Sequence, residues 1–118
     1  MLSSEKASLF AREWIEAFNS HDLERILGHY AEELEFHSPF IPLLKFNETG
    51  VIHTKQDLAS YFKVGLEAYP DLHFDFHDCY TGTDSLVIIY TSVNGRQAAE
   101  TFQLNGQGKA IRVQCHYR

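Results

Sequence analysis

The chain has 118 residues, of which 44% are hydrophobic and 22% are charged, as expected for one ordinary globular domain. Sixteen acidic and ten scattered basic residues give a formal net charge of −6, so binding to nucleic-acid phosphates is not expected. No apolar run approaches the ~20 residues that cross a bilayer, and the first residues lack the pattern of a signal peptide. We therefore expect one domain over residues 1–118, in the cytoplasm, with no membrane partner.

The first segment has the pattern of an amphipathic helix. Ser3 or Ser4 can cap it, and Phe10, Trp14 and Phe18 recur every four residues, which places them along one face. This face is entirely aromatic, so the helix is expected to cover a large apolar surface.

A short second helix and a strand follow. Asp22 can cap a helix over residues 23–30, in which leucine, isoleucine and tyrosine recur at helical spacing. From Leu34 to Ser38 apolar and polar residues alternate, which is the period of a half-buried strand, and Pro39 ends it.

The next stretch, from Phe40 to His53, is apolar but keeps neither a helix nor a strand period. We interpret it as a long loop that is either a lid over a pocket or part of a dimer surface. Thr54 and Asp57 have the spacing of a capping box and begin a third helix, which Pro70 ends.

The last third of the chain is predicted to form four strands. They are separated by turn signals at residues 82–84, 94–95 and 105–108, and turns this short join antiparallel neighbours. The order of helices followed by a meander predicts an α+β domain in which the helices cover one apolar face of the sheet.

The order of elements, together with the segments WIEAFNSHDLERILGHYAEELEFHSP and ETFQLNGQGK, resembles the nuclear transport factor 2-like superfamily. This superfamily includes ketosteroid isomerases and SnoaL-like polyketide cyclases, and the resemblance spans essentially the whole chain. It implies three helices on a strongly curved, mostly antiparallel mixed sheet, which together form a cone with an apolar pocket. It also implies frequent homodimers and diverse functions.

The resemblance carries the isomerase catalytic positions over only in part. The position of the catalytic tyrosine corresponds to Trp14, and the position of the carboxylate base to Ser38, which cannot act as a general base near neutrality. The position of the protonated acid corresponds to Glu100, which keeps a carboxyl group. Supporting tyrosines correspond to Tyr30, which is retained, and to Phe62, which lacks the hydroxyl. Steroid isomerase activity is therefore not expected.

Three residues are catalytic candidates: Glu100, Ser38 and His37. Glu100 shares a strand face with apolar neighbours, so its pKa should be raised if that face is covered; the alternative is a carboxyl group bonded for structural reasons. Alternation places His37 opposite Phe36 and Ser38, so His37 either acts through a bulge or packs behind the sheet.

The walls of the expected pocket are mainly aromatic. A stripe of this kind is usually part of a core, and the resemblance extends its role to ligand contact. The expected ligand-binding residues are Trp14, Phe18, Tyr30, Phe36, Phe62, Phe102 and Tyr117.

No metal or other cofactor is expected. On a strand, His73 and His77 would lie ~13 Å apart at ~3.3 Å per residue, too far for one ion to bind both. Their face is opposite Phe74 and Phe76, which indicates a polar outer surface. The cysteines, Cys79 and Cys115, have no metal-binding spacing and are expected to be free thiols.

Two classes of function remain open. The first is a protein that binds a small apolar molecule without catalysis. The alternative is an acid–base enzyme of isomerase, cyclase, hydratase or epoxide hydrolase type, in which Glu100 is the acid. In both cases a homodimer through the outer face of the sheet is expected.

Overall fold

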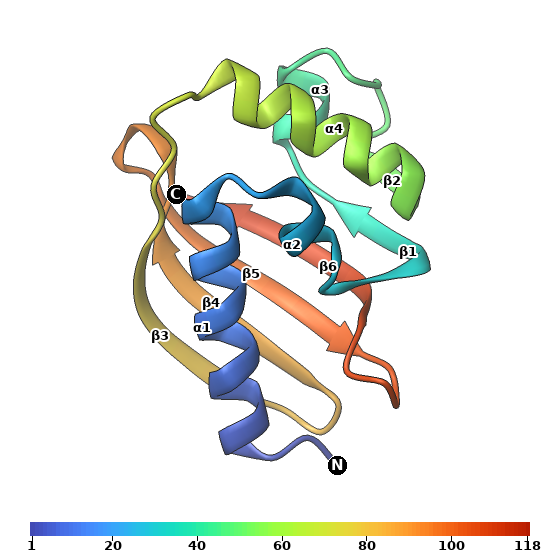
Figure 1. The fold of residues 1–118 in the computed structure, drawn as a ribbon, viewed down its shortest axis with the longest axis vertical. Coiled ribbons are helices and arrows are strands. Elements are labelled where there is room, and N and C mark those ends of the chain that lie inside the picture. Colours follow the sequence, from blue (N-terminus) through green and yellow to red (C-terminus); the bar gives the residue numbers. More distant parts are fainter.

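The computed structural model describes all residues, Met1–Arg118, as helices packed on one side of an open six-stranded sheet (Figure 1). The helices are α1 (Ser4–Ser20), α2 (Leu23–Leu27), α3 (Phe40–Leu43) and α4 (Lys55–Ala68), with a 3-10 turn, η1 (Val93–Gly95). The strands are β1 (Tyr30–His37), β2 (Val51–Thr54), β3 (Asp75–Thr81), β4 (Ser85–Thr91), β5 (Gln97–Leu104) and β6 (Ala110–Tyr117).

The sheet joins the two halves of the chain. Its strand order is β2-β1-β6-β5-β4-β3, and all neighbours are antiparallel except β1 and β6, which are parallel. The outer strands β2 and β3 do not pair with each other, so the sheet remains open. The predicted α+β class and mostly antiparallel mixed sheet are confirmed.

Local signals at the helix ends explain why α1 and α4 form where they do. The Ser3 side chain accepts a hydrogen bond from the amide of Lys6 at 3.1 Å and caps α1. His21 ends α1 in the left-handed region, with φ of 58°. The Thr54 side chain caps α4 by accepting from the amide of Asp57 at 3.1 Å, as the capping-box spacing predicted.

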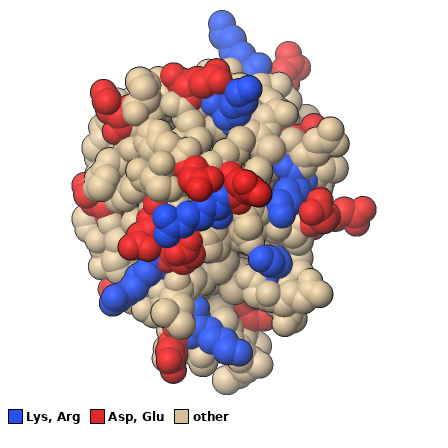
Figure 2. All heavy atoms as spheres, in the orientation of Figure 1, with Lys and Arg blue, Asp and Glu red and all other residues tan.

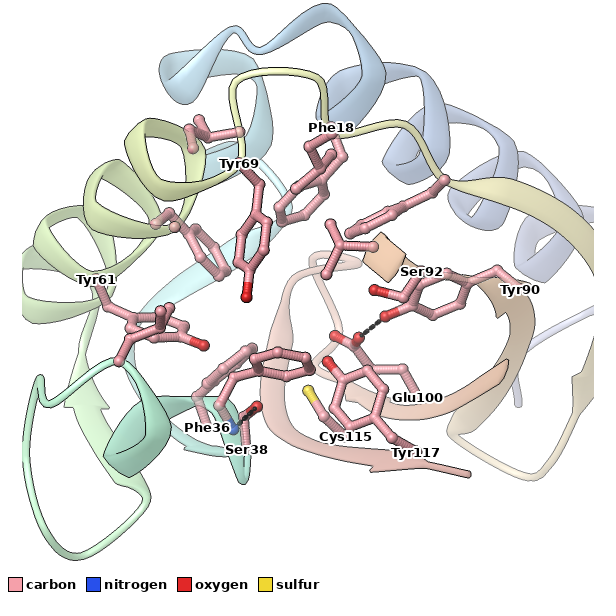
Figure 3. A pocket seen from close by; sticks show the side chains of 18 of the residues that line it. Phe18, Phe36, Ser38, Tyr61, Tyr69, Tyr90, Ser92, Glu100, Cys115 and Tyr117 are labelled. Carbon is pink, nitrogen blue, oxygen red and sulfur yellow. Dashed lines mark hydrogen bonds between the residues drawn. The ribbon is translucent and has the colours of Figure 1, made fainter. Parts of the chain in front are cut away.

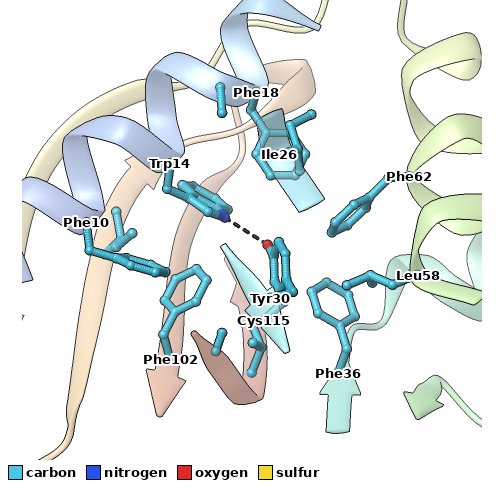
Figure 4. Close-up of a cluster of buried hydrophobic side chains, with 14 of the residues drawn as sticks. Phe10, Trp14, Phe18, Ile26, Tyr30, Phe36, Leu58, Phe62, Phe102 and Cys115 are labelled. Carbon is cyan, nitrogen blue, oxygen red and sulfur yellow. Dashed lines mark hydrogen bonds between the residues drawn. The ribbon is translucent and has the colours of Figure 1, made fainter. Parts of the chain in front are cut away.

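The two long helices cover different parts of the sheet. Helix α1 packs against β3, whereas α4 packs against β1 and β2, and α2 contacts both helices (Figure 1). Aromatic side chains fill most of the space between helices and sheet (Figure 4). On the surface in Figure 2, acidic and basic side chains are interspersed. None of the helices is long and apolar enough to cross a membrane.

The segment from Phe40 to His53 is not the unstructured loop that the sequence suggested. It contains the single turn α3 and the short strand β2, in which Ile52 pairs with Phe36 of β1. Pro42 lies within the first turn of α3, where a missing N–H costs no helical hydrogen bond. Both elements are too short to produce a recognisable period, and β2 depends on hydrogen bonds to a distant strand.

Bulges also break the alternation on which the sequence analysis relied. The β3–β4 register shifts between Phe76 and Asp78, so Cys79 instead of Asp78 lies opposite the buried Ile88. Phe76, before this shift, pairs with the buried Tyr90 but is itself 39% exposed on the edge strand. The β5–β6 register shifts as well, next to Ile111, and Ala110 takes the buried place beside Leu104.

Candidate functional site

A cavity lies between α1, α4 and the concave face of the sheet (Figure 3). Most of its 19 lining residues are hydrophobic, and its water-accessible volume is about 80 Å³. Pockets for drug-sized ligands begin at ~300 Å³, so this cavity suits a much smaller molecule. Its mouth is formed by partly exposed residues of α4 and η1, by the residues directly after α3 and α4, and by the segment before β3: Leu44, Leu66, Tyr69, Leu72 and Val93.

Glu100 on β5 is the single carboxyl group that lines this cavity. It is only 3% exposed, and its Oε1 accepts a hydrogen bond from Tyr90 Oη at 2.7 Å. Burial raises the pKa of Glu100 to about 7, although the contacts with Tyr90 and the Cys115 thiol act in the opposite direction. Near neutral pH a large fraction of Glu100 is therefore protonated and can donate a hydrogen bond.

A second polar pair, Ser38 and Tyr61, lines the cavity on its α4 side (Figure 3). Ser38 follows β1, is 4% exposed, and accepts a hydrogen bond at its Oγ from the amide of Phe40 at 3.2 Å. Burial raises the pKa of Tyr61, and the Ser38 side chain acts in the opposite direction. Both hydroxyl-bearing side chains line the same cavity.

Tyr117 on β6 brings a further hydroxyl group to the cavity. Its ring packs edge-on against Phe40 with a centroid distance of 4.7 Å. The guanidinium carbon of Arg96 lies 5.3 Å from the centroid of Tyr117 and 5.5 Å from that of Phe40, so one cation faces both rings. Both rings belong to the cavity wall.

Trp14 cannot offer its indole N–H to a ligand in this arrangement. Its Nε1 donates to Tyr30 Oη at 2.8 Å, deep in the aromatic cluster of Figure 4. Burial raises the pKa of Tyr30 well above its usual value, so the acceptor is a neutral phenol. The pair satisfies its own polar atoms and leaves Trp14 to contribute an aromatic wall.

The structure places most of the sequence-predicted site residues around one space, but not all of them. Glu100 and Ser38 line the cavity, as do the predicted wall residues Trp14, Phe18, Phe36, Phe62 and Tyr117.

Three predicted site residues lie elsewhere. His37 is outside the cavity lining, and its Nε2 lies 3.3 Å from Glu35 Oε1. Tyr30 and Phe102 do not line the cavity either, because both are buried behind its wall, in contact with Trp14.

Other residues of the cavity were not selected as site residues from the sequence. Tyr61 lies on α4 and Tyr69 is the C-cap residue directly after it, and the sequence indicated only their place in the helical segment. Tyr90 lies with Leu86 and Ile88 on the buried face of β4. This alternation indicates that its side chain points inward, but it does not reveal the contact with Glu100.

Known proteins resemble the chain over nearly its full length. A family model described as a SnoaL-like domain matches residues 11–118. A SnoaL-like protein of unknown function from Burkholderia thailandensis is 35% identical, with a TM-score of 0.93 over 98% of this chain and 97% of that one.

More distant structures share the fold. The epoxide hydrolase/cyclase-like enzyme SalBIII, which has a role in pyran ring formation in the polyether salinomycin, is 16% identical, with a TM-score of 0.79 over 100% of this chain and 95% of that one. An NTF2-like protein of unknown function from Burkholderia pseudomallei is 16% identical, with a TM-score of 0.78 over 99% of this chain and 92% of that one. No curated protein matches the chain.

Proposed function

Because the chain belongs to the SnoaL-like domain family, we propose that it binds a small, largely apolar molecule in the cavity between its helices and sheet. In this proposal an oxygen atom of the ligand accepts a hydrogen bond from Glu100. The observation that carries the proposal is one buried carboxyl group with a pKa of about 7 in an otherwise mainly aromatic cavity. Such a site combines apolar contact area with one orienting polar group.

The charges of the site support a neutral ligand. No Lys, Arg or His lines the cavity, so nothing there would neutralise a carboxylate or phosphate group. The formal net charge of −6 also disfavours the approach of anions. A neutral carbonyl, ether or hydroxyl oxygen is the polar group that protonated Glu100 can bind at the lowest desolvation cost.

Cyclohexanone tests this proposal, because it combines an apolar ring with one carbonyl oxygen. Titration of the ¹⁵N-labelled protein should shift amide resonances around Glu100 and Tyr90, and Glu100→Ala should weaken binding. Native mass spectrometry of the purified protein should also detect a co-purified small molecule. The proposal is wrong if neither cyclohexanone nor any co-purified molecule binds, or if the shifts lie away from these residues.

Acid catalysis is the second candidate, because Glu100 has the properties of a proton donor near neutral pH. The structural likeness to an epoxide hydrolase/cyclase-like enzyme makes epoxide opening a reasonable first reaction to test. Protonated Glu100 would donate its proton to the epoxide oxygen as the C–O bond breaks and water adds at carbon, and a second proton would pass to solvent. Ser38 could assist by orienting the substrate, since its side chain lines the same cavity.

Conversion of cyclohexene oxide to the diol, followed by gas chromatography, tests this second candidate. The rate should fall as the pH rises through about 7, because Glu100 loses the proton that it donates. Glu100→Gln should abolish conversion. A rate no higher than that of the buffer alone leaves ligand binding without catalysis as the function.

We also propose that the protein is a cytoplasmic homodimer. The outer face of the sheet carries no helix, and it presents exposed Arg112 and His116 together with half-buried Thr101 and Gln114. Both cysteines are free thiols, as is usual in a reducing compartment. Light scattering should give about twice the monomer mass of 13.6 kDa; the monomer mass itself would contradict the dimer.

A further inference from the structure

A second, larger space opens at the mouth of the cavity. It is a cleft between the segment that joins α4 to β3 and the turn η1, which lie side by side in Figure 1. Its water-accessible volume is about 470 Å³, within the usual range for ligand pockets. The cavity and the cleft share four wall residues, of which three belong to the mouth: Tyr69, Leu72, Ser92 and Val93. The two spaces therefore adjoin, and one elongated molecule can occupy both.

The walls of the two spaces differ in chemistry. Of the 19 residues around the cavity 15 are hydrophobic, but only four of the 12 residues around the cleft are. The cleft presents the carboxylates of Asp71 and Asp75, the ring of His73 and the amide of Asn94, and all four residues are exposed to water. The cavity therefore suits the apolar part of a ligand, and the cleft suits a hydrated polar part.

Hydrogen bonds from the end of α1 hold one wall of the cleft in place. The Asn19 side chain accepts from the amide of Phe74 at 2.7 Å and donates to the carbonyl oxygen of the same residue at 3.0 Å. His21 Nε2 lies 2.8 Å from the carbonyl oxygen of Leu72. This wall does not need a ligand to form, which is typical of binding sites.

The charges around the cleft determine which polar groups fit it. No Lys or Arg lines the cleft, and Asp71 and Asp75 would repel an anionic group. His73 Nε2 lies 3.3 Å from Asp75 Oδ1, so that carboxylate would neutralise any proton that His73 takes up. A hydroxyl group can donate to the carboxylates and accept from the Asn94 amide, whereas an ammonium group can only donate. Uncharged hydroxyl groups therefore match the cleft best.

We propose that the ligand is an elongated amphipathic molecule, with an apolar end in the cavity and an uncharged, hydroxylated end in the cleft. The apolar end carries the oxygen that Glu100 binds, so the inference rests on the proposed function and extends it to the class of ligand. The carbon atoms between the two ends pass the shared wall beside Tyr69 and Ser92. The cavity, at about 80 Å³, holds only the apolar end.

A set of ketones that share one ring tests this class. Cyclohexanone has no tail, whereas 4-(3-hydroxypropyl)cyclohexanone, 3-(4-oxocyclohexyl)propanoate and 3-(4-oxocyclohexyl)propyltrimethylammonium carry tails that end in a hydroxyl, a carboxylate or a cationic group. Dissociation constants can be measured by ¹H–¹⁵N chemical-shift titration of the intact protein. We expect the hydroxypropyl ketone to bind roughly five-fold tighter than cyclohexanone, which corresponds to one net hydrogen bond, and the charged tails to add no affinity. The amide signals of His73 and Asn94 should shift with the hydroxypropyl ketone but not with cyclohexanone.

The variant Ala68→Trp tests where the tail lies. Ala68 is exposed at the end of α4 and lines the cleft but not the cavity. A tryptophan ring there should occupy part of the cleft and remove the gain from the hydroxypropyl tail, while the affinity for cyclohexanone should change less than about two-fold. Ala59→Trp is the matched control: it is the same substitution on the same helix, outside both spaces, and should keep the gain. Thermal melting of each variant verifies that it is folded.

The outcomes separate this inference from the proposed function. If cyclohexanone binds but the hydroxypropyl tail adds no affinity, or if the gain persists in Ala68→Trp, the ligand does not extend into the cleft, and only the inference is overturned. Tighter binding of the carboxylate or ammonium ketone would show that the hydroxylated class is wrong. If none of the ketones binds, the proposed function and the inference are overturned together.

Discussion

Two aromatic regions of this molecule have nearly the same composition but opposite properties. In the sealed core, made of Phe10, Tyr30 and Phe102, the rings pack against one another or against Trp14, whose indole N–H has an internal acceptor in Tyr30. In the cavity, rings of the same kind surround open space, and hydroxyl and carboxyl groups face it. The difference lies in the space around the polar groups: those of the core are enclosed, whereas Glu100 and Ser38 lie beside open space although each also has a hydrogen-bond partner in the protein.

Phe102→Ala is expected to have the largest effect on stability, because Phe102 is fully buried in the sealed core. Large-to-small substitution at such a position costs about 3–5 kcal/mol of unfolding free energy. Leu66→Ala, at the partly exposed mouth of the cavity, should cost clearly less, since its side chain already faces open space. Urea denaturation measures both. Similar losses would show that the two regions are not distinct.

The ionisation of Glu100 in the cavity should make the free energy of unfolding depend on pH. The folded-state pKa of about 7 is raised from 4.5, so the native state favours the neutral acid. The resulting stabilisation is complete below about pH 4.5 and is lost as the pH rises through 7, with a total on the order of 3 kcal/mol. Burial lowers the pKa of His29, which works in the opposite direction at lower pH.

The difference between the wild type and Glu100→Gln isolates this effect from His29. We expect the wild type to lose unfolding free energy relative to Glu100→Gln between pH 5 and pH 8.5, as measured by urea denaturation at both values. A difference that stays constant with pH would mean that Glu100 is not held as a neutral acid in the folded protein.

The same substitution, Tyr to Phe, should have unequal effects in the two regions. Tyr30→Phe leaves the buried Trp14 N–H without its acceptor, which costs about 1–3 kcal/mol. Tyr61→Phe removes a hydroxyl group that faces the cavity, so its cost should be at most about 1 kcal/mol. Chemical denaturation of the two variants makes the comparison. Equal losses would indicate that the Tyr61 hydroxyl has a strong internal partner.

Sequence patterns predicted those parts of the fold that depend on neighbouring residues. The caps at Ser3 and Thr54 and the four-residue aromatic spacing lie within α1 and α4, so each is visible in a short window. Strand β2 was not predicted, because its four residues are held by pairing with β1, from which α3 separates them in the sequence. The bulges after Phe76 and at Ile111 are also set by strand pairing, not by local composition.

The sequence indicated which faces of the helices and strands carry the site residues, but not how deeply each side chain is buried. Alternation and the family resemblance pointed to Glu100 and Ser38, and both lie on the cavity wall. Nothing local distinguishes Tyr30, which is sealed in the core, from Tyr61, which faces the cavity. That distinction depends on how α4 packs against the sheet, which is a property of the tertiary structure.

The smallest predicted effect concerns the boundary between the two regions, where Arg96 lies over the rings of Phe40 and Tyr117. The two rings pack edge-on against each other, and both side chains line the cavity. Arg96→Gln should cost about 0.5–1 kcal/mol of unfolding free energy through loss of the cation–π contact, and Arg112→Gln on the outer face of β6 should cost less. If the contact also fixes the cavity wall, NMR signals of Tyr117 and its neighbours should broaden in Arg96→Gln alone. Sharp signals would show that packing against Phe40 is enough to hold the ring.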